Sequence, residues 1–306
     1  MQELSEFKVS FDPGSFLGRE IANVTLMELL GRGAMGAVYV AFQKSLKRKV
    51  ALKIFPKACS NLDNMRVLFR DEAETVAVLN HPNIVPVFDM GETGEVLYIM
   101  MQLVEGENLR SMIWRHQLHP LPSRRAIPVH KSIEMMVQVL DGLDYAHKEN
   151  VIHQDIKPAN IIIEERSGRV CIVDFGIART EFSSNQQSRY VFGTPLYMSP
   201  EQISGIQTDC RSDIYSAGMV LYETLAGKIP VKTPSMDELL NLKASDPDSL
   251  FKCSPSEACS SIDSKLEKIL LKAVAGNLES RYQSCAQFKS DLLDYVSSLQ
   301  GKAAHE

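Results

Sequence analysis

The sequence lacks the features that mark membrane, secreted or nucleic acid-binding proteins. No apolar run in it approaches the roughly 18 residues of a membrane-spanning helix. Its formal net charge is −5, so no excess of basic residues indicates a nucleic acid partner. The first residues, MQELSEFKVSF, contain neither a basic stretch nor an apolar core, so we expect no signal peptide.

Closely spaced cysteine pairs are also absent. The six cysteines are scattered along the chain, with no C-x-x-C spacing and no histidine at a metal-finger distance. This pattern predicts reduced thiols in a cytoplasmic protein and argues against a disulfide framework.

What is present is an ordinary globular composition in two unlike parts. Of the 306 residues, 44% are apolar and 23% charged, which suits one large domain or two small ones. Residues 24–104 are mostly strand-like, apart from a helical pattern over 64–79. The remainder is mainly helical, with apolar residues at helical spacing over 131–149, 213–227 and 283–299.

A glycine-rich stretch lies between two predicted strands. Residues 31–39 read GRGAMGAVY, a G-x-G-x-x-G pattern that lets backbone approach phosphate oxygens, although an ordinary glycine hairpin has the same pattern. The next strand, VALKIF, places Lys53 on the same face as Ala51 and Phe55. A lysine there needs an anionic partner, for which phosphates and Glu72 are candidates; a surface lysine with only its stem buried is the alternative.

Two further stretches combine carboxylates with an amide. VIHQDIKPANII, at 151–162, interrupts an apolar run with Asp155, Lys157 and Asn160. IVDFGIAR, which begins at residue 172, places Asp174 at the end of a strand. Carboxylate and amide oxygens suit Mg²⁺, which shares its remaining positions with water and phosphate oxygens. Each residue alone could simply cap a turn, but the ordered set predicts a site that handles phosphate and metal.

This ordered set resembles the eukaryotic-like (Hanks-type) serine/threonine protein kinases in their bacterial form. The glycine loop, V-A-x-K, H-x-D-x-K-x-x-N, D-F-G and a P-E element follow one another in kinase order. The resemblance implies an α+β, bilobal protein kinase fold, with a small, mainly β N-lobe containing one main helix and a larger, mainly α C-lobe. The implied boundaries are an N-terminal extension over 1–23, the N-lobe over 24–101, a hinge over 102–106, the C-lobe over 107–298 and a tail over 299–306.

The resemblance also implies an activity. It is the ATP- and Mg²⁺-dependent transfer of the γ-phosphoryl group to serine and threonine hydroxyls of proteins, in signalling, with autophosphorylation; Mn²⁺ is the alternative metal. The sequence is compatible with two alternative functions. One is a pseudokinase that binds nucleotide and acts as a scaffold, and the other is a kinase-like enzyme acting on a small molecule.

By resemblance, Asp155 is the catalytic base and Lys157 neutralises the transferring phosphoryl group. Lys53 would hold the α- and β-phosphates while paired with Glu72, and a metal ion would be held by Asn160 and Asp174. The nucleotide contacts implied by the family are Gly31, Arg32, Gly33, Ala34, Met35, Gly36, Val38, Ala51, Lys53, Met101, Gln102, Leu103, Val104 and Ile162.

The segment FGTPLYMSPEQ, at 192–202, matches the family's acceptor-binding segment. Thr194 would contact Asp155 and Lys157. The family's buried ion pair would join Glu201 to Arg281. Asp213 resembles the helix residue that anchors the backbone of the catalytic loop.

The chain departs from the family at Gln154, where an arginine usually reads a phosphate on the activation loop. A neutral amide cannot pair ionically with phosphate. We therefore expect less dependence on phosphorylation of that loop; neutral drift is the alternative. The hydroxyl-bearing residues available in the loop are Thr180, Ser183, Ser184, Ser188 and Tyr190.

The stretch 107–131 is rich in arginine, lysine and histidine, with Glu107 as its one acid. It suits either a docking face for an acidic partner or a solvated loop and helix end. For the chain as a whole we expect protein substrates of unknown identity, no nucleic acid, no membrane segment and a cytoplasmic location. A transient homodimer would serve autophosphorylation in trans.

Overall fold

The chain divides into two compact units, each described by itself below. The first comprises Met1–Asn80 and Val85–Glu105, and the second His81–Ile84 and Gly106–Glu306. This computed structural model describes residues 12–33, 36–57, 78–94, 96–175, 195–233 and 235–303. Most of the helix predicted over 64–79 lies outside these residues. The lobe, hinge and tail boundaries implied by the resemblance stay predictions.

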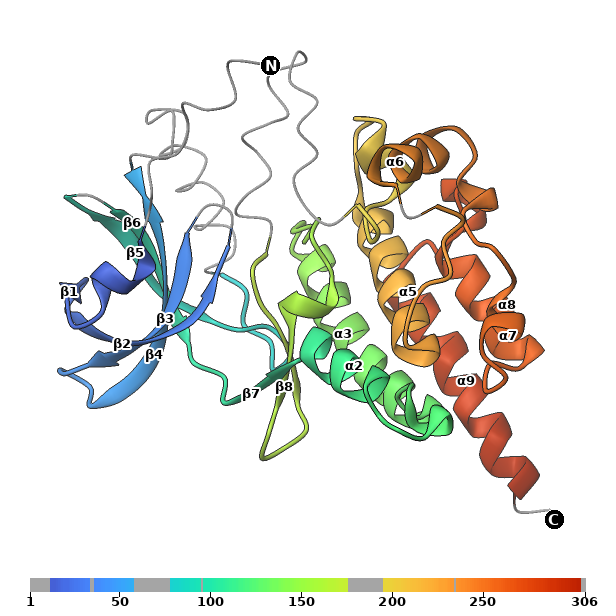
Figure 1. Cartoon of the computed structure of the whole chain (residues 1–306), viewed down its shortest axis with the longest axis horizontal. Helices are drawn as coiled ribbons and strands as arrows, with labels where there is room; N and C mark the ends of the chain where they lie inside the picture. Colours follow the sequence, from blue (N-terminus) through green and yellow to red (C-terminus); the bar gives the residue numbers. More distant parts are fainter. Residues whose placement is uncertain are drawn as a thin grey trace. The chain divides into compact units, whose positions relative to one another are not determined.

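The first unit is built on an antiparallel sheet with the strand order β1-β2-β3-β4-β6-β5 (Figure 1). A short 3₁₀ helix, η1 (Pro13–Phe16), precedes it. The strands are β1 (Glu20–Ile21), β2 (Val24–Arg32), β3 (Ala37–Gln43), β4 (Arg48–Pro56), β5 (Val87–Thr93) and β6 (Val96–Gln102). The mainly β character predicted for this part of the chain is confirmed.

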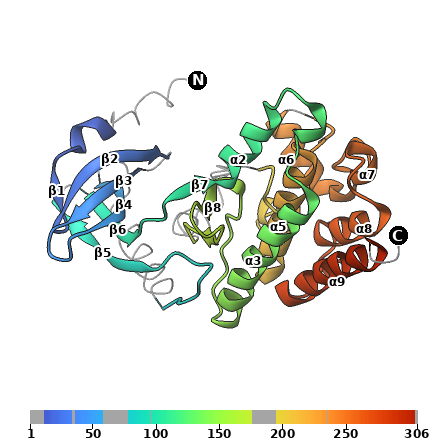
Figure 2. The same ribbon diagram turned by 90° about the horizontal axis from the view of Figure 1, so that it is seen from below.

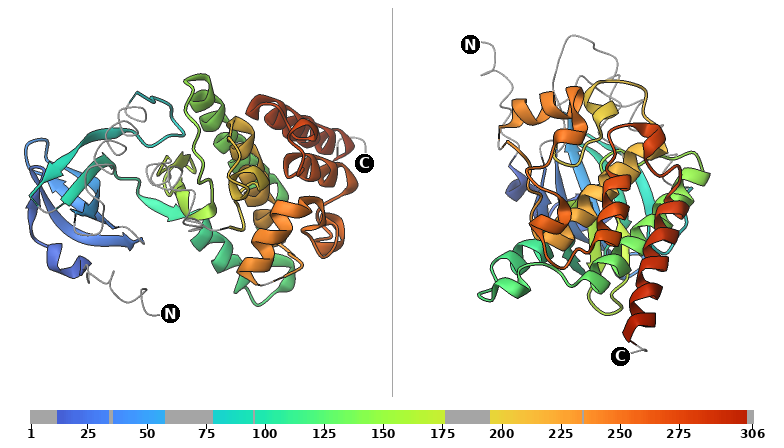
Figure 3. Two further views of the ribbon diagram at one scale, coloured as in Figure 1. Left: turned by 90° about the horizontal axis from the view of Figure 1, so that it is seen from above. Right: turned by 90° about the vertical axis from the view of Figure 1, so that its right-hand side faces the viewer.

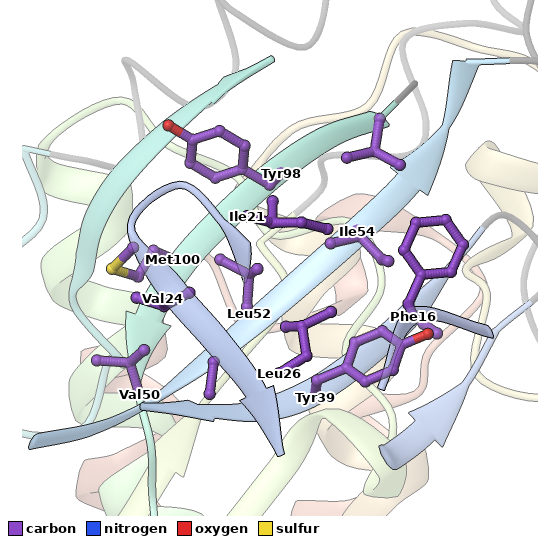
Figure 4. Close-up of a cluster of buried hydrophobic side chains, with 13 residues drawn as sticks. Phe16, Ile21, Val24, Leu26, Tyr39, Val50, Leu52, Ile54, Tyr98 and Met100 are labelled. Carbon is purple, nitrogen blue, oxygen red and sulfur yellow. The ribbon is translucent and has the colours of Figure 1, made fainter. Parts of the chain in front are cut away.

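The pairing register separates the two faces of this sheet. Tyr39 pairs with Leu52, and Leu52 pairs with Met100, so these three side chains share one face. That face carries the buried core shown in Figure 4. The core cluster contains Phe16, Ile21, Val24, Leu26, Ala37, Tyr39, Ala41, Val50, Leu52, Ile54, Val96, Tyr98 and Met100.

Part of the predicted N-terminal extension belongs to this core. Phe16 and Ile21 are buried in the cluster, and β1 pairs with β2. The Tyr39 hydroxyl donates a hydrogen bond to the Pro13 carbonyl at 2.9 Å. The sequence alone predicted that the first unit starts at Val24, but the packing of that unit begins ahead of this residue.

The second unit combines a small antiparallel sheet with helices. Its strands, in spatial order, are β7 (Gly106–Asn108), β8 (Ile161–Glu164) and β9 (Val170–Ile172). The α-helices are α2 (Leu109–Gln117), α3 (Val129–Lys148), α4 (Pro200–Ile203), α5 (Cys210–Ala226), α6 (Met236–Ser245), α7 (Pro255–Ala258), α8 (Ser264–Ala273) and α9 (Cys285–Ala303). The described part of this unit also contains the short 3₁₀ helices η3 (Pro122–Arg124), η4 (Pro158–Asn160), η5 (Pro247–Ser249) and η6 (Leu278–Ser280).

Helix α5 forms the centre of this unit. Most of its side chains are buried. It packs between α3 and α8, and α9 lies against α3 and α8 (Figures 2 and 3). Asp209 caps its first turn by accepting from the Arg211 N–H at 2.9 Å. Gly227 ends it with a φ of 76°, a left-handed conformation that glycine adopts without strain. No helix in the described part of the chain meets the length and hydropathy needed to cross a membrane.

Candidate active site

The sheet of the first unit brings four predicted nucleotide-binding residues onto one face. Val38 pairs with Lys53 across β3 and β4, and Ala51 pairs with Met101 across β4 and β6. Ala51 and Lys53 are two residues apart, so all four side chains lie on the face opposite the core cluster. Gly31 pairs with Val38 and so lies at the same end of the sheet.

The predicted glycines differ in how tightly they are packed. A Cβ at Gly36 would lie 2.0 Å from the Ile54 carbonyl oxygen, a distance that excludes any side chain. A Cβ at Gly31 would meet nothing within 4 Å among the described atoms, and one at Gly33 only a carbonyl at 3.8 Å. Of these three glycines, contacts with the described residues require glycine only at Gly36. Arg32 ends β2, while Ala34 and Met35 lie outside the described residues.

Lys53 is partly buried, and its Nζ lies 5.4 Å from the centre of the Phe55 ring. Its predicted partner Glu72 lies outside the described residues. In the predicted hinge, the Gln102 N–H donates to the Pro86 carbonyl at 3.1 Å. Val104 is 9% exposed and Leu103 is partly exposed.

In the second unit, the predicted catalytic residue Lys157 and the predicted metal ligand Asn160 both contact the carboxylate of Asp155. Lys157 Nζ lies 2.6 Å from Asp155 Oδ2. The Asn160 amide donates to Asp155 Oδ2 at 3.1 Å and to the Asp155 carbonyl at 2.9 Å. The η4 turn, which begins with a proline directly after Lys157, brings Asn160 back to the aspartate. Ile162 follows in β8, partly exposed.

His153 holds the backbone of Asp155. It is fully buried, and burial lowers the pKa of His153, which keeps the ring neutral at pH 7. Because the Asp155 N–H donates to Nδ1 at 3.2 Å, Nε2 carries the ring hydrogen and donates to the Val173 carbonyl at 3.0 Å. The ring also packs against Phe175, with centroids 4.5 Å apart.

Asp213, on α5, anchors the catalytic loop as the resemblance predicted. It accepts from the His153 N–H at 2.8 Å, from the Gln154 N–H at 2.7 Å and from His147 Nε2 at 2.8 Å. Gln154 has a φ of 63°, and these bonds hold that left-handed conformation. Burial acts to raise the pKa of Asp213, but the hydrogen bond and charge of His147 outweigh it and leave the pKa lowered.

A backbone hydrogen bond brings the chain around the two predicted metal ligands, Asn160 and Asp174, together. The Val173 N–H donates to the Asn160 carbonyl at 3.0 Å, which brings Asp174 beside the η4 turn. Since the Asn160 amide nitrogen is engaged by Asp155, its amide oxygen is the atom left for a ligand. No cluster of three or more His, Cys, Asp or Glu side chains suited to a metal exists among the described residues. Two protein oxygens fit Mg²⁺, which keeps its waters and takes phosphate oxygens, better than a metal that needs a full protein cage.

The predicted acceptor segment is described only from Pro195 onward, and Thr194 lies outside the described residues. Beyond it, Arg281 Nη1 and Glu201 Oε1 form the predicted buried ion pair at 2.8 Å, so that prediction is confirmed. Ser212 Oγ also donates to Glu201 at 2.7 Å.

The sequence did not point to several residues that complete this region. His147 reaches Asp213 from the last turn of α3, and Gln202 and Lys243 contact the backbone around the acceptor segment. Lys243 lies four residues after the buried Leu239 in α6, a spacing that places both on one helix face. That spacing was the one available signal that this lysine is buried.

A carboxylate contacted by a lysine and an amide, with Asp174 in the neighbouring backbone, is an arrangement suited to phosphoryl transfer. Comparison with known proteins identifies the family. The model of the protein kinase domain family matches residues 24–293. The chain therefore belongs to the protein kinase family.

Two similar proteins are serine/threonine-protein kinases of bacteria by their names. The chain is 38% identical over 284 residues to the probable serine/threonine-protein kinase PknB of Bifidobacterium longum, covering 89% of this chain and 39% of that protein. It is 37% identical over 275 residues to PknB of Mycobacterium leprae, covering 88% of this chain and 42% of that protein. The chain thus spans about two fifths of the length of these curated relatives.

A solved structure agrees with this assignment. The kinase domain of Mycobacterium tuberculosis PknI matches with a TM-score of 0.72 and 28% identity, covering 92% of this chain and 98% of that one. The predicted class, a Hanks-type serine/threonine kinase domain of bacterial form with an α+β kinase fold, is confirmed.

Proposed function

We propose that this chain is the catalytic domain of an ATP- and Mg²⁺-dependent protein kinase that phosphorylates serine and threonine hydroxyls of other proteins. The observation that carries the proposal is the arrangement around Asp155. Its carboxylate contacts Lys157 and Asn160, and its loop is anchored by Asp213. Phosphoryl transfer requires mainly positioning and charge stabilisation, and these groups supply both.

In this proposal Asp155 accepts the proton of the acceptor hydroxyl as that oxygen bonds to the γ-phosphorus of ATP. The bond from phosphorus to the bridging oxygen breaks, and ADP leaves with its electron pair. Lys157, 2.6 Å from the carboxylate, is close enough to offset the charge on the transferring group. Thr194 would hold the acceptor loop to the same two residues.

On the nucleotide side, Lys53 would hold the α- and β-phosphates with Glu72 as its partner. Val38, Ala51 and Met101 share the face of the sheet that carries Lys53, which supports their assignment to the adenine pocket. The Gln102 N–H is taken by Pro86, so the hinge residues Gln102, Leu103 and Val104 would meet adenine through other backbone atoms. The backbone at Gly31, Arg32, Gly33, Ala34, Met35 and Gly36 would cover the phosphates.

Asn160 and Asp174 would hold the metal, which when bound neutralises phosphate charge. We propose Mg²⁺ as the working ion and Mn²⁺ as a substitute. Titrating both ions against the transfer rate tests this choice: a protein active with Mn²⁺ alone would contradict it.

A scaffold that binds nucleotide without transfer is the second candidate. The intact contacts of Asp155 with Lys157 and Asn160 favour the enzyme. Incubation with Mg²⁺ and γ-labelled ATP, with dephosphorylated casein as acceptor, separates the two. We expect label on casein with the wild type and with Lys49→Ala, an exposed lysine on the same strand as Lys53, and none with Lys53→Ala. ATP binding without any transfer by the wild type would favour the scaffold.

We further propose that the kinase acts in the cytoplasm and phosphorylates copies of itself in trans through a transient homodimer. An Asp155→Asn copy, extended by a tag so that it separates on a gel, serves as the acceptor. Labelling of that copy by the wild type is the expected result. Labelling confined to the wild type at all concentrations would rule out transfer in trans.

A further inference from the structure

Lys243 is a fully buried cation whose nearest partners are backbone carbonyls. Its Nζ donates to the Leu196 oxygen at 2.6 Å and to the Met198 oxygen at 2.7 Å. The ring of Tyr215 lies 4.9 Å away. A buried charge is costly unless it is matched by hydrogen bonds, so a lysine held in this place has a specific structural task.

Side chains of neighbouring helices hold three successive backbone carbonyls, those of Leu196, Tyr197 and Met198. Between the two that Lys243 holds, the Tyr197 carbonyl accepts from Ser216 Oγ of α5 at 2.8 Å. The Tyr197 hydroxyl in turn donates to the Glu223 carboxylate. The backbone of Leu196–Met198 is thus fixed by side chains of α5 and α6, without a strand or helix of its own.

The other end of this segment is tied to the catalytic loop. Gln202 accepts from the Ser199 N–H at 3.0 Å and donates to the Gln154 carbonyl at 3.0 Å. Gln154 directly precedes Asp155. A shift of this segment would therefore change the position of the acceptor-binding backbone relative to Asp155, the candidate base.

We propose that Lys243 is a positioning residue that fixes the acceptor-binding segment of the kinase by holding the Leu196 and Met198 carbonyls. The inference rests on the proposed kinase function and adds a determinant for the protein substrate. Burial lowers the pKa of Lys243, yet the bonds survive loss of the extra proton, because a neutral amine keeps two N–H donors for two carbonyls. The charge of Glu201 acts to raise the pKa of Lys243, but this carboxylate is already paired with Arg281.

The test compares Lys243→Met, which keeps the chain length and removes the donors, with Lys252→Met at an exposed lysine. Steady-state kinetics with dephosphorylated casein and with ATP are measured for both variants and the wild type. We expect the KM for casein to rise about tenfold in Lys243→Met, since two hydrogen bonds to the segment are lost, with the KM for ATP and the acceptor-free hydrolysis of ATP unchanged. Lys252→Met should match the wild type.

Ser216→Ala provides a milder second variant, should Lys243→Met not fold. It removes only the donor to Tyr197 and one bond within α5, and we expect a smaller rise in the same KM. An unchanged KM for casein in both variants, or a parallel rise in the KM for ATP, would overturn the proposal. Absence of transfer by the wild type would instead contradict the kinase function itself, so the two failures are distinguishable.

Discussion

Replacing Asp213 with asparagine tests how the catalytic loop is held. The carboxylate accepts two backbone N–H groups, at 2.7 and 2.8 Å, and the His147 ring at 2.8 Å, in a fully buried place. An asparagine has one acceptor oxygen, and its amide hydrogens would face donors that need an acceptor. Its volume is nearly the same, so the change removes bonding without opening a cavity.

The magnitude follows from those contacts. A hydrogen bond to a charged group contributes about 1.5–3 kcal/mol, and at least one such bond is lost. The left-handed conformation of Gln154 costs about 1–2 kcal/mol and loses part of its support. We therefore expect Asp213→Asn to lower the free energy of unfolding by about 3 kcal/mol. A displaced loop should also lower kcat on the order of 10²-fold.

Urea unfolding followed by circular dichroism measures the first quantity, and labelled transfer to casein measures the second. Asp294→Asn, at an exposed position on α9, is the matched control and should change neither. If Asp213→Asn unfolds at the same urea concentration as the wild type and transfers phosphate at the same rate, the anchoring role is wrong.

Three further predictions concern the ion pair, the activation loop and the glycine loop. Burial acts to raise the pKa of Glu201, but the bonds to Arg281 and Ser212 outweigh burial and leave the pKa below the ordinary 4.5. The ion pair therefore stabilises the fold fully above pH 4.5, and this stabilisation is lost as the pH falls through the lowered pKa. Glu201→Gln should thus cost about 3–5 kcal/mol at pH 7, and a deficit that persists undiminished in acid unfolding would contradict this. The triple alanine variant at Ser183, Ser184 and Ser188, which lie beyond the described ranges, should keep most transfer activity in a casein assay. Complete loss would refute the hypothesis that Gln154 reduces the dependence on phosphorylation of the activation loop. Gly36→Ala should lower the thermal unfolding temperature by several degrees, since its Cβ would lie 2.0 Å from a β4 carbonyl oxygen; an unchanged value would contradict the packing.

The motifs predicted that Asp155, Lys157 and Asn160 lie together, because the three residues belong to one short stretch of chain. Asp155, Lys157 and Asn160 fall within one turn-forming segment, so their spacing alone brings them together. The anchoring role of Asp213 and the pair of Glu201 with Arg281 span long sequence distances. They were predicted through the family resemblance, not through any local pattern, and the structure confirms both.

Other contacts could not be predicted because they depend on register and tertiary packing. The strand pattern showed that Lys53 and Ala51 share a face, but not that Val38 and Met101 lie beside them. Phe16 and Ile21 lie in short, irregular elements with no periodicity, so nothing local marked them as core. The spacing of Lys243 from Leu239 was a weak local signal of burial, and the carbonyls that the lysine contacts explain why a charged side chain lies there.

Asp155→Asn tests most directly whether Asp155 serves phosphoryl transfer and not nucleotide binding alone. ATP affinity and the rate of label transfer to casein are measured on the same preparation. We expect wild-type ATP affinity and a rate lower by on the order of 10²–10⁴-fold, the range for removal of a general base. A transfer rate equal to that of the wild type, with ATP bound equally well, would contradict it.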